Sequence, residues 1–212
     1  MNNLKYLKII KGGMLIVFEG IDGASKSTQS KILYENIKRK YSVIMRSYPD
    51  ISGRYGTIIN EFLHKRCEMS VEEQFLLFLC DIMKDLADLS RYQIVIVDRY
   101  YPSTIAYQCA SSFSYEKAKD IIRLLSLPTP DVLFYLHIPV DEALRRKKDS
   151  SRFENAQFLR RVQKLYERMI DERFPCAWTK ISATENVSTI AANVLNVVEK
   201  HIARCLNDTA LP

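Results

Sequence analysis

Residues 19–28 have the types and the spacing that hold a chain of phosphates. Glycines stand at positions 20 and 23, and Lys26 is followed by two hydroxyl residues. In such a turn the backbone N–H groups converge on phosphate oxygens, the lysine reaches the terminal phosphates and the first hydroxyl ligates Mg²⁺. We therefore predict a triphosphate site with Ser27 on the metal. The predicted nucleotide-binding residues are Gly20, Ile21, Asp22, Gly23, Ala24, Ser25, Lys26, Ser27 and Thr28.

One position departs from the common pattern G-x-x-x-x-G-K-[ST], because Ser25 stands where a second glycine is usual. Where this position has a positive φ, a serine side chain costs on the order of 1–2 kcal/mol, which a bound phosphate can offset. An ordinary turn before a helix is the alternative interpretation. The context favours the phosphate site, because an apolar run at 14–18 precedes the loop and helix-spaced apolar residues follow it at 32, 33 and 37.

A second group of polar residues closes the segment 93–98, whose β-branched run is typical of a strand buried on both faces. Ligands of an open α/β sheet lie beyond the carboxyl ends of its strands, so we expect Asp98 and Arg99 beside the phosphate loop. Asp98 would hold the Mg²⁺ shell through water, and Arg99 would bind a second phosphate with two N–H groups. The alternative interpretation is a helix cap and a surface arginine.

Basic residues fill positions 145–148, and a further arginine follows at 152. Such a run is usually the solvated face of a helix. Phosphoryl transfer, however, spreads charge over the oxygens of the migrating group, and cations on a part that closes after substrate binding stabilise that charge. We therefore predict a lid at about 141–155, with Arg145, Arg146 and Arg152 as catalytic residues.

Length and composition limit the class of protein. The 212 residues, 47% hydrophobic and 26% charged, are typical of one globular domain. The net charge of +6 favours an anionic partner, but no RNA-binding signature or continuous basic helix points to nucleic acid, which stays a minor alternative. Five cysteines without a C-x-x-C pair indicate reduced thiols in the cytoplasm. No apolar run approaches the roughly 18 residues of a membrane span, and no signal-peptide pattern is present.

Strand and helix patterns alternate along the chain. Strand candidates lie at 14–18, 42–46, 93–98, 132–138 and 179–182. Helical patterns lie at 29–37, 54–66, 70–90, 102–110, 114–126, 139–149, 154–173 and 186–206. This alternation predicts an α/β fold with a mostly parallel sheet and right-handed crossovers. We expect an N-terminal extension at 1–13, a single domain at 14–206 and a C-terminal tail at 207–212.

Several of these motifs occur together in one known family. From about Met14 to His201 the chain resembles the thymidylate kinases, a family of P-loop nucleoside monophosphate kinases. The resemblance rests on Phe18-Glu19-Gly20-Ile21-Asp22-Gly23 with Lys26-Ser27-Thr28, Asp98-Arg99-Tyr100 with Ser103, Ala106-Tyr107-Gln108, Pro130-Asp131 and Arg152-Phe153-Glu154. It implies a three-layer P-loop kinase fold, with a five-stranded parallel sheet of order 2-3-1-4-5 flanked by helices, and usually a homodimer. It also implies transfer of the γ-phosphoryl group of MgATP to dTMP, giving dTDP.

The resemblance also implies roles for single residues. Lys26 would bind the β- and γ-phosphates, and Arg99 the acceptor phosphate. Asp22 would contact the acceptor sugar, and Phe78 would stack on the base. Gly23, where one branch of the family carries an arginine, implies that the catalytic arginines come from the lid. The implied catalytic residues are Lys26, Arg99, Arg145, Arg146 and Arg152, and the implied acceptor-binding residues are Asp22, Tyr48, Pro49, Phe78, Arg99, Tyr100, Ser103, Thr104, Tyr107 and Gln108.

Two positions on the acceptor side depart from the family. Ile51 and Ile82 stand where relatives often carry arginines, and the loss of an arginine aimed at a base can cost on the order of 10²-fold in discrimination. A kinase of the same fold with another acceptor therefore stays open, the acceptor being another nucleotide or a hydroxyl on a small molecule or a protein serine or threonine. A nucleotide switch is disfavoured because no N-K-x-D motif occurs. Intact Lys26, Asp98 and Arg99 argue against a catalytically silent paralogue.

Overall fold

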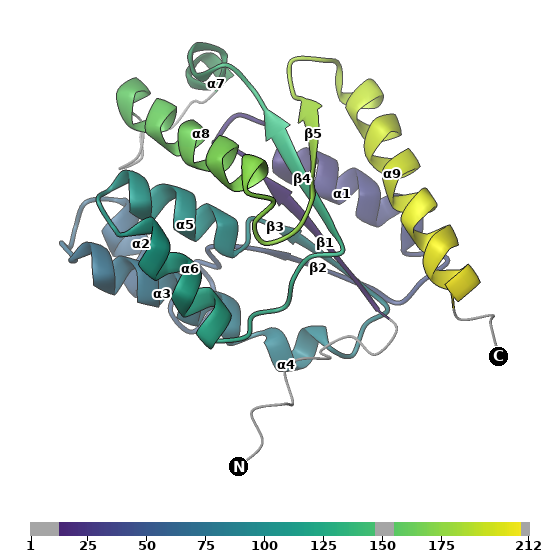
Figure 1. Ribbon diagram of the computed structural model, residues 1–212, viewed down its shortest axis with the longest axis horizontal. Helices are drawn as coiled ribbons and strands as arrows, with labels where there is room; N and C mark the ends of the chain where they lie inside the picture. The colour runs from purple at the N-terminus through teal and green to yellow at the C-terminus, as the bar shows by residue number, and fades with distance from the viewer. Residues whose placement is uncertain (1–12, 147–154, 209–212) are drawn as a thin grey trace.

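The computed structural model describes residues 13–146 and 155–208, which contain a five-stranded parallel sheet (Figure 1). The strands lie in the order β2-β3-β1-β4-β5, so the expected order 2-3-1-4-5 is confirmed. Each neighbouring pair is parallel. The strands are β1 (Met14–Glu19), β2 (Val43–Ser47), β3 (Ile94–Asp98), β4 (Val132–His137) and β5 (Trp178–Ser182).

Helices cover both faces of the sheet and complete three layers (Figure 1). One face carries α1 (Lys26–Ile37) and α9 (Val187–Asp208), which pack against each other. On the other face, α5 (Tyr101–Ala110) packs against both α3 (Val71–Met83) and α8 (Ala156–Asp171). The other helices of the described ranges are α2 (Gly56–Leu63), α4 (Leu86–Leu89), α6 (Tyr115–Leu124) and α7 (Val140–Arg146). Within those ranges we find no helix with the length and apolar character needed to cross a membrane.

Strands β1 and β3, which lie inside the sheet, are buried along their whole length. This agrees with their nearly uninterrupted apolar sequence, because a parallel strand under helices on both faces has no solvated side. β1 pairs with β3 in the register that places Phe18 opposite Asp98. The two strands therefore end side by side, and the phosphate loop and Arg99 follow at the same edge of the sheet.

The helix predicted at 70–90 is interrupted and forms α3 and α4. The Lys84 ammonium donates a hydrogen bond of 2.9 Å to the backbone carbonyl of Asp81. In an uninterrupted α-helix that carbonyl would accept from the N–H of Asp85. Asp85 donates to the carbonyl of Ile82 instead, at 3.3 Å. The helix tightens and ends here, because a side chain has taken the place of a backbone donor.

The other predicted strands and helices of the described ranges are confirmed, with ends that shift by a few residues. The first helix begins earlier than predicted, at Lys26, and the last continues to Asp208, beyond the predicted boundary at 206. Except for Gly13, the predicted extension at 1–13 lies outside the described residues, as does the middle of the predicted lid, residues 147–154.

Phe134 on β4 is a sensitive probe of this core. Its side chain is fully buried, and its ring stacks on that of Phe18 with centroids 5.0 Å apart. Phe134→Ala removes the ring and leaves a cavity, so the free energy of unfolding should fall by about 3–5 kcal/mol in urea denaturation. Leu124→Ala, at a side chain that is 83% exposed, should change it by no more than about 0.5 kcal/mol. Equal losses in the two variants would contradict this assignment of the core.

Candidate active site

The phosphate loop joins β1 to α1 and contains three residues with positive φ, namely Gly20 (144°), Gly23 (84°) and Ser25 (62°). A Cβ at Gly20 would lie 2.6 Å from the carbonyl oxygen of Leu136, so this position has no room for a side chain. Ser25 has the left-handed conformation that favours a glycine, and it is the N-cap of α1 without a capping hydrogen bond from its side chain. The first N–H groups of α1 therefore stay available to an anion.

Lys26 lies in the first turn of α1 and folds back over the loop. It is 6% exposed, and its ammonium donates to the carbonyl oxygen of Ile21 at 2.9 Å. Burial and the positive charge of Arg99 lower the pKa of Lys26 to about 8, while nearby carboxylates oppose the shift. A bound triphosphate would favour the charged form, because its own charge is negative.

Lys26 lines a pocket of about 360 Å³ at the ends of β1 and β3. Of the predicted nucleotide-binding residues, Gly20, Ile21 and Ala24 are buried and do not line it. The lining residues come from the phosphate loop, the ends of β2 and β3, and α7. They are Asp22, Gly23, Ser25, Lys26, Ser27, Thr28, Ser47, Tyr48, Asp98, Arg99 and Arg146.

Asp98 and Ser27 share this phosphate pocket and fit a Mg²⁺ ion. Asp98 is 4% exposed, and its Oδ1 atom has no hydrogen-bond partner among the described residues. A buried carboxylate oxygen is costly unless a ligand or a donor satisfies it. Carboxylates, waters and substrate phosphates are the ligands that Mg²⁺ usually takes, and in P-loop enzymes the loop hydroxyl joins them. The predicted metal residues thus have suitable chemistry and lie in one pocket.

Helix α7 packs directly on the phosphate loop. A Cβ at Gly23 would lie 2.7 Å from the carbonyl oxygen of Ala143, so α7 occupies the space that a side chain at 23 would need. Arg146, the last residue of α7, donates to the carbonyl oxygen of Ala183 at 2.9 Å and reaches that of Gly23 at 3.5 Å. One predicted lid arginine therefore lines the phosphate pocket.

The other two predicted lid arginines have different positions. Arg145 is 75% exposed, pairs with Glu142 on its own helix and lines neither the phosphate pocket nor the cavity described next. Arg152 lies outside the described residues. Adjacent arginines at the end of one helix point in different directions, because successive residues are about 100° apart around the helix axis. The catalytic role of Arg145 and Arg152 stays a prediction.

A second cavity, of about 180 Å³, lies between α3, α5 and the loop after β2. Its volume is several times the roughly 30 Å³ share of one water in the liquid, so it has room for an organic group. All ten predicted acceptor-binding residues line it, together with Leu63 and Ile82. Asp22, Tyr48 and Arg99 line this acceptor cavity and the phosphate pocket alike, so the two sites meet at these side chains.

Arg99 holds the junction between the two sites. Its backbone has a positive φ of 68°, and its side chain is 14% exposed. The guanidinium pairs with Asp22, donates to the Ser103 hydroxyl at 3.1 Å and lies over the ring of Tyr107, 5.2 Å from the centroid. No other lysine or arginine of the described residues lines the acceptor cavity. An arginine fixed in this way is suited to two-pronged binding of a phosphate.

Glu19 supports this arrangement from the end of β1, a role that sequence reasoning missed. It is fully buried and accepts hydrogen bonds from the N–H groups of Tyr100 (2.8 Å) and Ser103 (3.3 Å). The hydroxyls of Ser103 and Tyr166 also donate to it. Because Tyr100 is the N-cap of α5 without a capping side chain, Glu19 acts as the missing cap. Burial raises the pKa of Glu19, while its hydrogen-bond donors and Arg99 oppose that shift.

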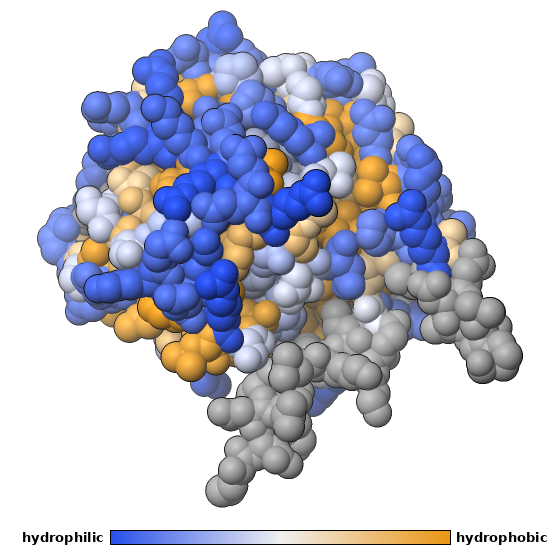
Figure 2. Space-filling model, in the orientation of Figure 1, coloured by the Kyte–Doolittle hydropathy of each residue, from blue (hydrophilic) through white to orange (hydrophobic). Residues whose placement is uncertain are grey.

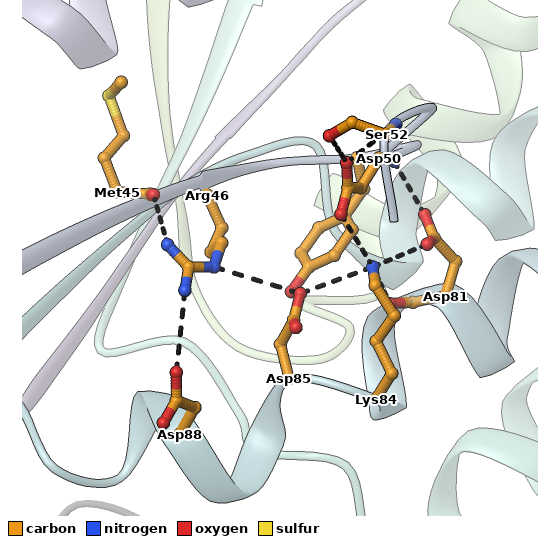
Figure 3. A network of polar contacts seen from close by, with 9 residues as sticks. Met45, Arg46, Asp50, Ser52, Asp81, Lys84, Asp85 and Asp88 are labelled. Atoms are coloured by element: carbon orange, nitrogen blue, oxygen red, sulfur yellow. Dashed lines mark hydrogen bonds and ion pairs between the residues drawn. The ribbon is translucent and has the colours of Figure 1, made fainter. Parts of the chain in front are cut away.

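A charged network fixes the outer wall of the acceptor cavity (Figure 3). The Tyr48 hydroxyl donates to Asp85 at 2.9 Å, and the N–H of Asp50 donates to Asp81 at 2.8 Å. The Lys84 ammonium lies 2.6 Å from Asp81, 3.3 Å from Asp50 and 3.4 Å from Asp85. This network ties the loop after β2 to the end of α3.

The far end of the acceptor cavity is mostly apolar. Ile82, at one of the two positions that depart from the family, is 1% exposed and lines the cavity beside Leu63 and Phe78. Ile51, at the other, is 59% exposed and lies outside it. Gln108 is 1% exposed, and its Oε1 atom has no partner among the described residues. One amide therefore faces a cavity end made of hydrocarbon.

Comparisons with known proteins point to one family. Residues 18–194 match the sequence model of the thymidylate kinase family. The chain is 32% identical to the thymidylate kinase of Desulfotalea psychrophila, over 89% of this chain and 95% of that protein. It is 30% identical to the thymidylate kinase of Caenorhabditis elegans, over 89% of this chain and 91% of that protein. The solved structure of the thymidylate kinase from Candida albicans is similar with a TM-score of 0.75 and 26% identity, covering 89% of this chain and 92% of that chain.

The lowered pKa of Lys26 predicts that nucleotide affinity depends on pH. Above a pKa of about 8 the free protein loses the ammonium charge, so the affinity for MgATP should be about tenfold weaker at pH 9 than at pH 7. Isothermal titration calorimetry at several pH values measures this. Lys26→Met should bind weakly at every pH and show no such decline. A wild-type affinity that stays constant up to pH 9.5 would contradict the prediction.

Proposed function

Because the chain belongs to the thymidylate kinase family, we propose that it transfers the γ-phosphoryl group of ATP to dTMP, forming dTDP and ADP. The observation that carries this proposal is the meeting of the phosphate pocket and the acceptor cavity at Asp22, Tyr48 and Arg99. The phosphate pocket contains the loop and lysine of a triphosphate site, and the acceptor cavity contains a buried arginine suited to a monophosphate. Phosphates bound in the two sites would face each other across Arg99.

On the donor side, the N–H groups of the loop and of the first turn of α1 would hold the ATP phosphates, with Lys26 on the β- and γ-phosphates. Ser27 would hold Mg²⁺ directly, and Asp98 would hold it through water. The bound ion neutralises charge that develops on the phosphates. The unpartnered Oδ1 atom of Asp98 supports this assignment.

On the acceptor side, Arg99 would bind the phosphate of dTMP. Asp22, which lines both sites, would accept a hydrogen bond from a sugar hydroxyl of dTMP. Phe78 would stack on the base, and the amide of Gln108 would bond its polar edge. The hydrocarbon of Leu63 and Ile82 suits the methyl group of thymine, which supports dTMP as the acceptor despite the absence of an arginine at 82.

The chemistry proposed is in-line transfer that depends on positioning and charge. A monophosphate is already ionised near neutral pH, so no general base is needed. Lys26, Arg99 and Arg146 already line the phosphate pocket and would stabilise the migrating group. We propose that the lid at about 141–155 closes over the substrates and adds Arg145 and Arg152.

We propose that residues 14–206 form one kinase domain, with residues 1–13 as an extension and 207–212 as a tail, and that the protein works in the cytoplasm. Cys80, Cys109 and Cys176 are free thiols, which suits a reducing compartment. Burial raises the pKa of Cys109 to about 12 and of Cys176 to about 11, so these two thiols are poor nucleophiles near neutral pH.

We also propose a homodimer formed through the outer face of α3. Leu76 is 52% exposed and Met83 is 37% exposed, and the exposed Cys80 lies between them at helical spacing. Figure 2 shows hydrophobic residues at the lower left of the molecule, over α3 and α6. Apolar side chains at i, i+4 and i+7 form one stripe, which a second copy would cover.

A panel of acceptors tests the function. With MgATP and the purified protein, release of ADP should be fastest with dTMP, compared with dUMP, CMP, AMP and a serine-containing peptide. Lys26→Ala should abolish the release, because the triphosphate loses its principal cation. A coupled ADP assay measures both. If another acceptor is used more efficiently than dTMP, the proposed substrate is wrong.

Sedimentation velocity tests the dimer. Leu76→Glu places charges against each other in the proposed interface, so the protein should sediment as a 24.6 kDa monomer. Val187→Glu, at a side chain 47% exposed on the opposite layer, should leave the dimer intact. A wild-type protein that is monomeric at micromolar concentration would refute the assembly.

A further inference from the structure

Lys84 stands between the two walls of the acceptor cavity without lining it (Figure 3). One wall is the loop after β2, which contributes Tyr48 and Pro49, and the other is α3, which contributes Phe78 and Ile82. Lys84 directly follows α3, and its ammonium reaches Asp50 in the loop at 3.3 Å. The Lys84 side chain is 8% exposed and that of Asp50 is 29% exposed, so the contact is partly shielded from solvent.

The loop is shaped to present Asp50 to Lys84. The N–H and the hydroxyl of Ser52 both donate to Oδ1 of Asp50, at 3.1 and 2.7 Å, which leaves Oδ2 for the ammonium. Gly53 lets the chain pass close by, because a Cβ there would lie 2.3 Å from Oδ2 of Asp50 and 2.7 Å from Cε of Lys84. The loop therefore folds around this ion pair.

Carboxylates outnumber cations in the network. Asp50, Asp81 and Asp85 converge on the Lys84 ammonium, and Asp81 is completely buried. Arg46 approaches Asp85 at 3.9 Å and Asp88 at 3.7 Å, from the side away from Asp50. Among the described residues, Lys84 is the cation paired with both Asp50 and Asp81. Without it, the loop carboxylate and the helix carboxylates would repel each other.

We propose that Lys84 is a positioning residue that holds the loop at 48–53 in the shape that receives the acceptor nucleotide. The inference rests on the proposed kinase function and deepens it on the acceptor side. The ammonium draws the loop onto α3 through Asp50, and it also lies 5.2 Å from the centroid of the Tyr48 ring. Tyr48 and Pro49 are then fixed opposite Phe78 and Ile82 before the nucleotide binds.

Of the loop at 48–53, only Tyr48 also lines the phosphate pocket among the described residues, so the loop bears mainly on acceptor binding. A loop that must be ordered by the incoming nucleotide weakens the binding of that nucleotide, whereas a loop ordered in advance does not. The phosphates of ATP would be held by the loop at 20–28 and by α1, neither of which belongs to the loop at 48–53 or to α3. Loss of Lys84 should therefore raise KM for dTMP and leave KM for ATP and kcat near their wild-type values, because saturating dTMP restores the loop.

The test compares three variants by steady-state kinetics. Lys84→Met removes the cation and should raise KM for dTMP about tenfold, with kcat and KM for ATP changed by no more than about twofold. Lys84→Met/Asp81→Asn removes the cation together with the charge of its buried partner, so it should fold even if Lys84→Met does not. It should raise KM for dTMP in the same way. Lys119→Met is the matched control, because Lys119 is 12% exposed, pairs with Glu172 at 2.8 Å and lines neither the acceptor cavity nor the phosphate pocket. It should leave all three constants unchanged.

The outcomes distinguish a failure of the proposed kinase function from a failure of the positioning role of Lys84. If the wild-type protein does not phosphorylate dTMP, the proposed function fails. If it does, and the folded Lys84 variants show an unchanged KM for dTMP, or a KM for ATP that rises in parallel, the positioning role of Lys84 is refuted. Recovery of KM in Lys84→Arg, which restores the positive charge, would support the role further.

Discussion

The parallel pairing of β1 with β3 is the constraint on which the site depends. Because Phe18 lies opposite Asp98, the phosphate loop and Arg99 leave the sheet as neighbours. The N–H of Arg99 donates to the carbonyl of Phe18 at 3.0 Å, and the N–H of Tyr100 donates to Glu19. The first residues after β3 are thus bonded to the last residues of β1. The phosphate pocket and the acceptor cavity are therefore built on the bonded ends of β1 and β3 rather than on two independent loops.

Charges of both signs gather around these strand ends. Lys26, Arg99 and Arg146 supply positive charge, and Asp22, Asp98 and Glu19 supply negative charge. Most of these groups already have partners, such as Arg99 with Asp22 and Glu19 with four donors. Two local costs are not offset by contacts within the described residues. They are the positive φ of Ser25 and the unpartnered Oδ1 atom of Asp98. Local costs of this kind collect where a ligand restores the balance.

Much of the fold and of the site could be predicted from the sequence, because the relevant signals are local. Continuous β-branched runs mark the buried strands, and the glycines with Lys26 mark the phosphate loop. The features that were missed depend on bonds between side chains and the backbone. The break after Met83 arises when the Lys84 side chain takes a backbone carbonyl, and the cap that Glu19 gives to α5 joins residues 81 positions apart. The different directions of Arg145 and Arg146 likewise depend on how α7 packs.

The close packing of α7 on Gly23 limits how this catalytic centre can change. The backbone of Ala143 fills the place where a side chain at 23 would begin, and Arg146 extends from the same helix to line the phosphate pocket. A side chain at 23 and the backbone of α7 therefore compete for one volume. A single substitution could not add a side chain at 23, since α7 would have to withdraw first.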